Sequence, residues 1–173
     1  LYDTANNIHS AHLLAEVCAQ GFLLLNSDVL CHPGILKEAL ADCQGSFLVV
    51  DPARPPRPEA MKVKMTGGRL AAIGKHLDAE TADGEYVGIA GFDRRGAAAF
   101  FRSIDAILAR GGDDEWYESG IAEAAREVAF SLRSTRERPW IEIDDHQDLE
   151  RAAREVLPRL TAIGAAPLPG RDV

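Results

Sequence analysis

The chain has few basic residues and no basic block. Lysine and arginine number 19 against 27 aspartates and glutamates, so the formal net charge is −8 and the isoelectric point is about 5.1. Non-specific binding to a nucleic-acid backbone requires clustered lysine and arginine. We therefore expect no nucleic-acid partner, although a few local cations and a metal ion would still allow a small anionic substrate.

Cysteines and long apolar runs are also scarce. The three cysteines, Cys18, Cys31 and Cys43, are odd in number, which argues against a disulfide framework and favours a reduced, cytoplasmic compartment. No apolar run approaches the roughly 18 residues of a membrane span, so we expect no membrane partner. The histidines show no zinc-type spacing with the cysteines, and no serine lies in a nucleophile-elbow pattern. Neither a zinc site nor a serine-hydrolase triad is indicated.

The composition is otherwise that of one soluble globular domain, since 46% of the 173 residues are apolar and 27% are charged. Strand-like and helical segments alternate along the chain. We expect strands at about 22–26, 46–50, 86–92 and 140–143, and helices at about 7–20, 33–41, 97–110, 115–128 and 147–157. This alternation predicts a three-layer α/β/α domain with a mixed, mostly parallel sheet.

Two further features complete the predicted fold. Residues 61–65 and 70–73 flank Gly67 and Gly68, a pattern typical of a β-hairpin inserted into the domain. We expect a single domain over residues 1–163, with the last residues, 164–173, forming a flexible tail that carries prolines and glycines.

Two of the strand-like segments end in acidic residues. Residues 22–25 lead into Asn26, Ser27 and Asp28, and residues 140–143 lead into Asp144. Open α/β folds place their ligands at the carboxyl ends of strands. Mg²⁺ is commonly held by one or two carboxylates, with phosphate oxygens and water filling its other positions. The sequence therefore predicts a divalent-metal site formed by Asp28 together with Asp144 or its neighbour.

Strand alternation distinguishes between the neighbouring acids of the second segment. Glu142 and Asp144 are two residues apart and share a face of an extended strand. Asp144 is therefore the preferred metal ligand. Asp145 is expected to cap the last helix instead, with Asp148 in the first turn of that helix.

Taken in order, these segments resemble the nucleotidyltransferase superfamily, and most closely its small cytidylyltransferases of the phosphocholine and inositol-phosphate type. The resemblance is carried by residues 2–10, 26–28, 59–63, 73–75, 84–89, 140–145 and 148–149. Such enzymes have a Rossmann-like fold that opens with a strand and a Gly-rich loop carrying a basic residue. The sequence contains no such loop, so we expect a fold lacking its first strands, some two thirds of the whole, within a longer polypeptide.

The resemblance implies a reaction and its partners. A phosphate monoester would attack the α-phosphorus of a nucleoside triphosphate, with CTP favoured, and pyrophosphate would be released. Mg²⁺ held by Asp28 and Asp144 would be the cofactor, and a small phosphorylated alcohol, polyol or phosphonate the acceptor. Two alternatives stay open: a sugar-1-phosphate nucleotidyltransferase, and a non-catalytic binding domain with the same fold. A homodimer is the default expectation for the assembly.

The resemblance also implies further site residues. Lys75 is expected to contact phosphate as a catalytic cation and Lys62 as a substrate-binding one, although lysines on an exposed hairpin are commonly only solvated. Ser27, Glu85 and Gly88 are expected to bind substrate. Gly88 could equally mark a β-bulge, and Glu85 a strand-edge charge in water.

Some polar and aromatic residues have two interpretations. Asn7 and Ser10 could contact substrate, but helix capping explains both and is preferred. Trp116 and Tyr117 stand between acidic residues at the start of a predicted helix. They could form a cage for a quaternary ammonium group, whereas core packing is the commoner role of such a pair.

Overall fold

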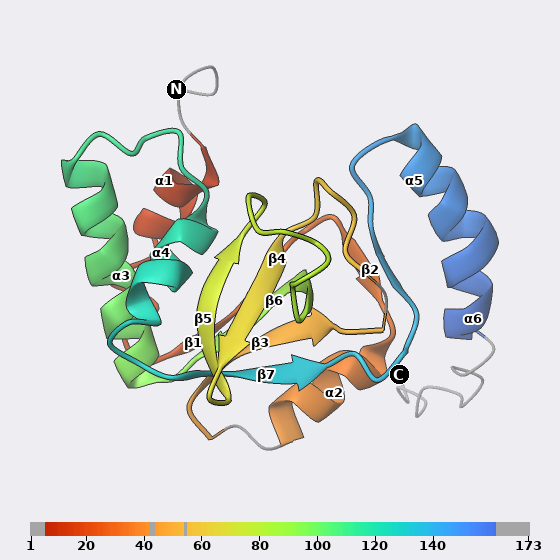
Figure 1. Cartoon of the computed structure of the whole chain (residues 1–173), viewed down its shortest axis with the longest axis horizontal. Coiled ribbons are helices and arrows are strands. Elements are labelled where there is room, and N and C mark those ends of the chain that lie inside the picture. The colour runs from red at the N-terminus through yellow and green to blue at the C-terminus, as the bar shows by residue number, and fades with distance from the viewer. Residues whose placement is uncertain (1–5, 42–43, 54, 162–173) are drawn as a thin grey trace, which may run out of the picture.

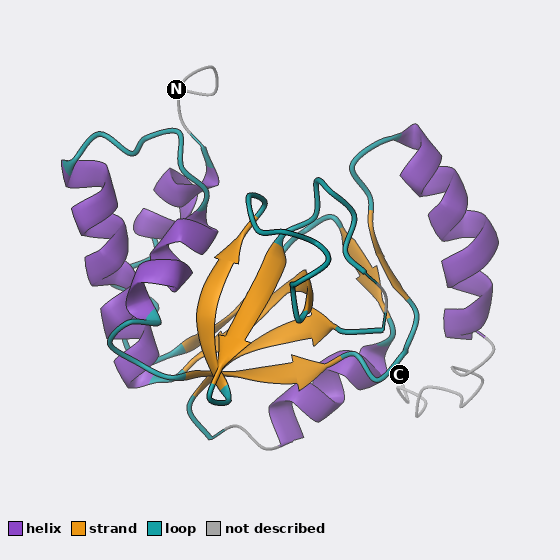
Figure 2. Cartoon of the chain, in the orientation of Figure 1, coloured by secondary structure: helices purple, strands orange, loops and turns teal. Residues whose placement is uncertain are grey.

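The computed structural model describes residues 6–41, 44–53 and 55–161, so the predicted tail at 164–173 lies outside the described residues. It has the predicted α/β character (Figures 1 and 2). The strands are β1 (Phe22–Leu25), β2 (Val29–Cys31), β3 (Ser46–Asp51), β4 (Lys62–Thr66), β5 (Arg69–Gly74), β6 (Gly84–Phe92), β7 (Phe130–Ser134) and β8 (Trp140–Glu142). The helices are α1 (Asn7–His12), α2 (Pro33–Ala41), α3 (Arg94–Ala109), α4 (Tyr117–Ala124), α5 (His146–Arg151) and α6 (Leu157–Thr161), and a π-helical turn at Ala152–Val156 joins α5 to α6.

The main sheet has six strands in the order β5-β4-β6-β3-β7, with β1 also paired to β6. It is mixed, as predicted, but its pairings are mostly antiparallel rather than parallel. Among the described strands, only β3 and β7 pair in parallel. The reason is the direction of β6, which runs opposite to β1, β3 and β4 and pairs with all three.

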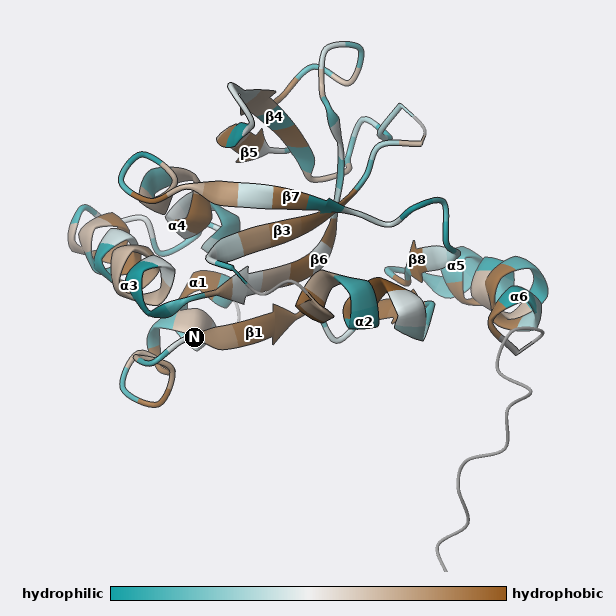
Figure 3. Cartoon of the chain, turned by 90° about the horizontal axis from the view of Figure 1, so that it is seen from below, coloured by the Kyte–Doolittle hydropathy of each residue, from teal (hydrophilic) through white to brown (hydrophobic). Residues whose placement is uncertain are grey.

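Helices cover both faces of the sheet, which confirms the three layers. Along β3, Leu48 and Val50 belong to a core cluster shared with α1, α3 and α4. Phe47 and Val49 point the other way and pack in a second cluster with α2. All four side chains are at most 2% exposed. In Figure 3 the central strands are accordingly coloured mainly as hydrophobic, because both of their faces are buried.

The predicted hairpin is confirmed as β4 and β5. Gly67 and Gly68 form its turn with φ angles of 58° and 76°. Positive φ at both central residues is the type I′ geometry that glycine adopts without steric cost. The position of this turn could therefore be predicted from its two glycines.

The first helix is shorter than predicted and has a different cap. It ends at His12, and Asn6 caps it by accepting a hydrogen bond from the Asn7 amide at 2.7 Å. The expectation that Asn7 or Ser10 would be the cap is wrong. Asn7 Oδ1 instead accepts from the backbone N–H of Tyr117 at 2.8 Å, which ties α1 to the start of α4.

The C-terminal helical segment begins close to its predicted start. Asp145 is its N-cap, as expected, and accepts from the amides of Gln147 and Asp148. A small apolar cluster that includes Ile141 and Val156 packs this segment against β8. β2 and β8 pair with each other in a separate two-stranded ribbon, and this ribbon was not predicted. The strand β7 was also missed. No helix in the described part of the chain is long and apolar enough to cross a membrane.

Candidate active site

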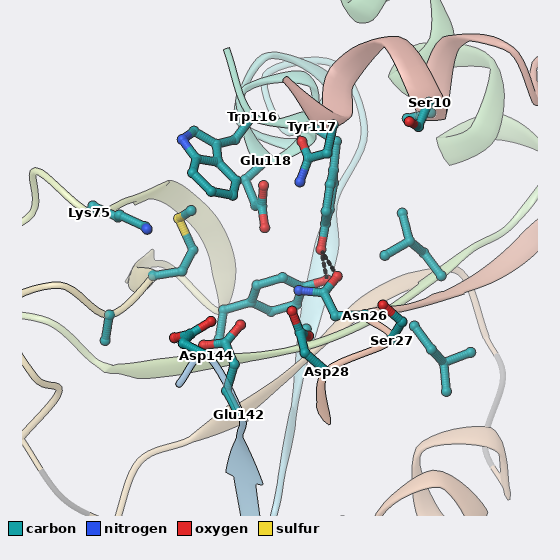
Figure 4. A pocket seen from close by; sticks show the side chains of 18 of the residues that line it. Ser10, Asn26, Ser27, Asp28, Lys75, Trp116, Tyr117, Glu118, Glu142 and Asp144 are labelled. Carbon is teal, nitrogen blue, oxygen red and sulfur yellow. Dashed lines mark hydrogen bonds between the residues drawn. The ribbon is translucent and has the colours of Figure 1, made fainter. Parts of the chain in front are cut away.

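Three carboxylates meet at one end of the β2–β8 ribbon. Val29 pairs with Glu142, and the amide of Ile143 donates to the carbonyl of Asp28 at 2.9 Å. This register places Asp28 just before one strand and Asp144 just after the other. Oxygens of Asp28, Glu142 and Asp144 lie within 4.8 Å of one another (Figure 4). Asp28 and Asp144 therefore converge, as predicted. Glu142 joins them because it lies on the same face of the strand as Asp144.

The cluster is electrostatically strained and chemically suited to a hard cation. The pKa of Glu142 is raised, first by burial and then by the negative charges of Asp144 and Asp28. A divalent cation would offset this repulsion. The donors are all oxygens, and Asp28 and Asp144 are exposed, which leaves room for water and phosphate oxygens around an ion. The residues thus fit Mg²⁺.

The acidic cluster forms part of the wall of a pocket of about 560 Å³. This volume is within the range of small-molecule sites. The wall is built from α1, the β1–β2 connection, β6, the start of α4 and the end of β8. Of the residues predicted from the sequence, Ser27, Asp28, Lys75, Gly88 and Asp144 line this pocket.

Lys62 is not among the residues that line this pocket. Its side chain is 1% exposed, and its ammonium donates to the carbonyls of Pro58 at 2.6 Å and Ala60 at 3.0 Å. The lysine therefore holds the proline-rich loop that precedes β4 (residues 55–61) against this strand, rather than facing the pocket.

Replacing Lys62 by methionine should lower the free energy of unfolding by about 2 kcal/mol, because two carbonyls, one of them buried, lose a charged donor. Urea denaturation followed by circular dichroism measures this change. The exposed Lys37 on α2 offers a matched Lys→Met control, for which we expect wild-type stability. An unchanged midpoint for Lys62→Met would contradict the structural role.

Glu85 also lies outside the lining of this pocket. It is near Arg57, at 3.9 Å between Nη2 and Oε1, and both line a smaller neighbouring pocket of about 80 Å³. The two pockets share Arg57 and Glu142. Glu85 therefore lies in a neighbouring pocket that adjoins the main cavity at Arg57 and Glu142.

Lys75 and Gly88 lie at the pocket for identifiable reasons. The ammonium of Lys75 is 4.5 Å from the ring centroid of Trp116, a cation–π contact that orients an exposed lysine toward the cavity. Gly88 has φ +75°, and a Cβ there would be 2.8 Å from Nδ2 of Asn26. A side chain at position 88 would thus displace Asn26 from its place in the pocket.

A hydrogen-bonded group of Tyr86, Tyr117 and Asn26 in this pocket was not predicted from the sequence. The hydroxyl of Tyr117 donates to Oδ1 of Asn26 at 2.8 Å, and the hydroxyls of Tyr86 and Tyr117 are 3.2 Å apart. Burial raises the pKa of both tyrosines, so both stay neutral hydrogen-bonding groups. The network fixes Asn26 and thereby the Asn-Ser-Asp segment that carries Asp28.

Glu118 was also missed. It is 5% exposed, and burial raises its pKa to about 7. Its Oε2 is buried without a hydrogen-bond partner among the described residues. The acidic and aromatic pattern around Trp116 marked this segment in the sequence. It could not show that Glu118, rather than Glu85, faces the main cavity.

Comparison with known proteins identifies the fold in which this pocket lies. No protein-family model matches the sequence, and no curated protein sequence matches it significantly. Solved structures, by contrast, do match the structure of this chain. The inositol-1-phosphate CTP transferase from T. maritima superposes with a TM-score of 0.71 at 19% identity, over 96% of this chain and 65% of that one.

Two further structures agree. The CTP:phosphocholine cytidylyltransferase from Streptococcus pneumoniae gives a TM-score of 0.63 at 18% identity, over 87% of this chain and 63% of its own. A protein described as a glucose-1-phosphate thymidylyltransferase from Bacillus anthracis gives 0.65 at 9% identity, over 97% of this chain and 65% of its own. The chain thus spans between 63% and 65% of the length of these three structures. Over that length, it has the fold of the nucleotidyltransferases.

Proposed function

We propose that the protein is a Mg²⁺-dependent nucleotidyltransferase. More specifically, we propose a cytidylyltransferase that transfers a nucleotidyl group from CTP to a small phosphorylated alcohol, polyol or phosphonate and releases pyrophosphate. The observation that carries this proposal is the convergence of Asp28, Glu142 and Asp144 at the edge of a pocket, within a nucleotidyltransferase fold.

The reaction asks for placement and charge neutralisation more than for acid–base chemistry. Asp28, Glu142 and Asp144 would hold Mg²⁺, which when bound screens the two anionic reactants and polarises the α-phosphate. Arg57 lines the same pocket and offers positive charge to phosphate oxygens, whereas Lys75 lines it from the α4 side, over the ring of Trp116. The phosphate contact expected of Lys75 stays a prediction. Asn26, fixed by Tyr117, keeps the segment that carries Asp28 in position.

The nucleotide preference is supported by the two cytidylyltransferase structures. The alternative, a sugar-1-phosphate nucleotidyltransferase, is supported by the thymidylyltransferase structure. The homodimer expected from the sequence stays a prediction, as does a cytoplasmic location.

Pyrophosphate release tests the proposal directly. The full chain is incubated with MgCl₂, each nucleoside triphosphate in turn and a panel of phosphate monoesters, sugar 1-phosphates and phosphonates. We expect acceptor-dependent release with CTP, abolished by EDTA. Release only with sugar 1-phosphates and another base would favour the alternative. No release from any pair by folded protein would leave a non-catalytic binding domain.

A further inference from the structure

Glu118 is a buried carboxylate in the pocket wall that the acidic cluster does not use. It is the second residue of α4 and lies across the cavity from Asp28 and Glu142 in Figure 4. A buried carboxylate oxygen without a hydrogen bond costs on the order of 1–3 kcal/mol or more. Such a group calls for an explanation, and a partner that binds there is one. Its Oε2 is therefore a place where a ligand would gain a hydrogen bond.

The surroundings of Glu118 restrict the kind of ligand. Lys75 already covers the ring of Trp116 with its ammonium, at 4.5 Å, and its charge acts on Glu118. A quaternary ammonium group approaching this ring would meet a like charge. It also has no N–H or O–H to donate to Oε2. One face of the Trp116 ring, which the cage considered from the sequence would use, is therefore already covered by the protein's own lysine.

A hydroxyl group matches the same surroundings. It carries no charge that Lys75 would repel, and it can both donate and accept a hydrogen bond. Burial raises the pKa of Glu118 to about 7, so both its charged and neutral forms exist near neutral pH, and each can pair with a hydroxyl. Met61 lines both this cavity and the smaller pocket beside Glu118, and it gives the wall near the carboxylate an apolar part.

We propose that Glu118 is a specificity-determining residue that accepts a hydrogen bond from a hydroxyl of the acceptor, so that the acceptor is a polyol phosphate and not a quaternary-ammonium phosphate. This inference rests on the proposed function, in which the phosphate of the acceptor lies toward the cation site. It assigns the opposite, carbon-bearing end of the acceptor to the α4 side of the pocket.

Matched phosphates test the inference by binding, separately from turnover. Isothermal titration calorimetry on the full chain in MgCl₂, with and without a non-hydrolysable CTP analogue, compares three probes. Inositol 1-phosphate carries ring hydroxyls, cyclohexyl phosphate lacks them, and phosphocholine carries a quaternary ammonium. We expect the wild type to bind inositol 1-phosphate at least about tenfold more tightly than either other probe, because an unpaired polar group in the site disfavours analogues without a donor.

Variants of Glu118 connect the preference to this residue. Glu118→Leu should reduce the preference to within about threefold, whereas Glu118→Gln keeps an oxygen acceptor and should retain most of it. Circular dichroism verifies that both are folded. Glu127→Gln, an exposed glutamate paired with Arg102 and outside the pocket, should bind as wild type.

The outcomes separate the two proposals. A wild type without hydroxyl preference, or one that binds none of the three probes, overturns the role of Glu118. So does an unchanged preference in Glu118→Leu, even if pyrophosphate is released. A preference that depends on Glu118 without pyrophosphate release from any substrate pair supports this inference and counts against catalysis alone.

Discussion

Replacing Asp28 by asparagine should lower the rate of pyrophosphate release by about 10³-fold while leaving the fold intact. The substitution removes one of three charges that would hold the cation, and metal-ion charge stabilisation is worth several kcal/mol in a transition state. Asp28 is exposed, so an isosteric change there has little structural cost. Asp144→Asn should behave in the same way.

Two measurements distinguish loss of the cation from general damage. Mn²⁺ binding followed by electron paramagnetic resonance should weaken at least tenfold in Asp28→Asn, independently of turnover. Asp114→Asn changes another exposed aspartate, outside the pocket lining, and should leave both rate and affinity unchanged. Wild-type turnover by folded Asp28→Asn would contradict the proposal that the carboxylate cluster holds a catalytic cation.

Glu118→Gln should make the protein more stable at alkaline pH, by about 3 kcal/mol, with the gain disappearing near pH 4. The pKa of Glu118 is raised by burial from 4.5 to about 7 in the folded protein. The folded state therefore binds more protons than the unfolded state between these values. Wild-type stability falls as the pH rises through this window, and the full cost, roughly 1.4 kcal/mol per pKa unit, is present above it.

Glutamine cannot ionise and has no such cost. The measurement is the free energy of unfolding in urea at intervals from pH 4 to pH 8.5 for both proteins, and the difference between the two curves isolates position 118. The exposed control Glu127→Gln should give a curve parallel to that of the wild type. If the Glu118→Gln curve is also parallel, then Glu118 is not buried in the way described.

The residues of the candidate metal site were predictable from local rules. Asp28 follows a short apolar strand, and alternation along residues 140–144 puts Glu142 and Asp144 on one face. Their convergence depends in addition on the antiparallel pairing of β2 with β8, which was not predicted. The hairpin was predictable for a similar reason, since Gly67 and Gly68 permit only a few turn types.

The remaining site residues depend on packing that no local pattern encodes. Lys62 and Lys64 are two residues apart and share a face of a strand, so the sequence does not distinguish them. Only the path of the proline-rich loop decides that Lys62 is the buried one, beneath two carbonyls. Glu85 and Glu118 are both acids beside an aromatic residue. Which of them faces the main cavity is set by how α4 packs against α1, through the contact of Asn7 with Tyr117. Pairing directions in the sheet also depend on long-range topology.

The ribbon of β2 and β8 would couple the proposed ion binding to the docking of the C-terminal helical segment. The strand that carries Glu142 also packs against the C-terminal helical segment through Ile141 and Val156. A cation held by Asp28 and Asp144, as proposed, would bind only while β8 is docked on β2. By thermodynamic linkage, its binding free energy would then add to the resistance of that helical segment to local detachment.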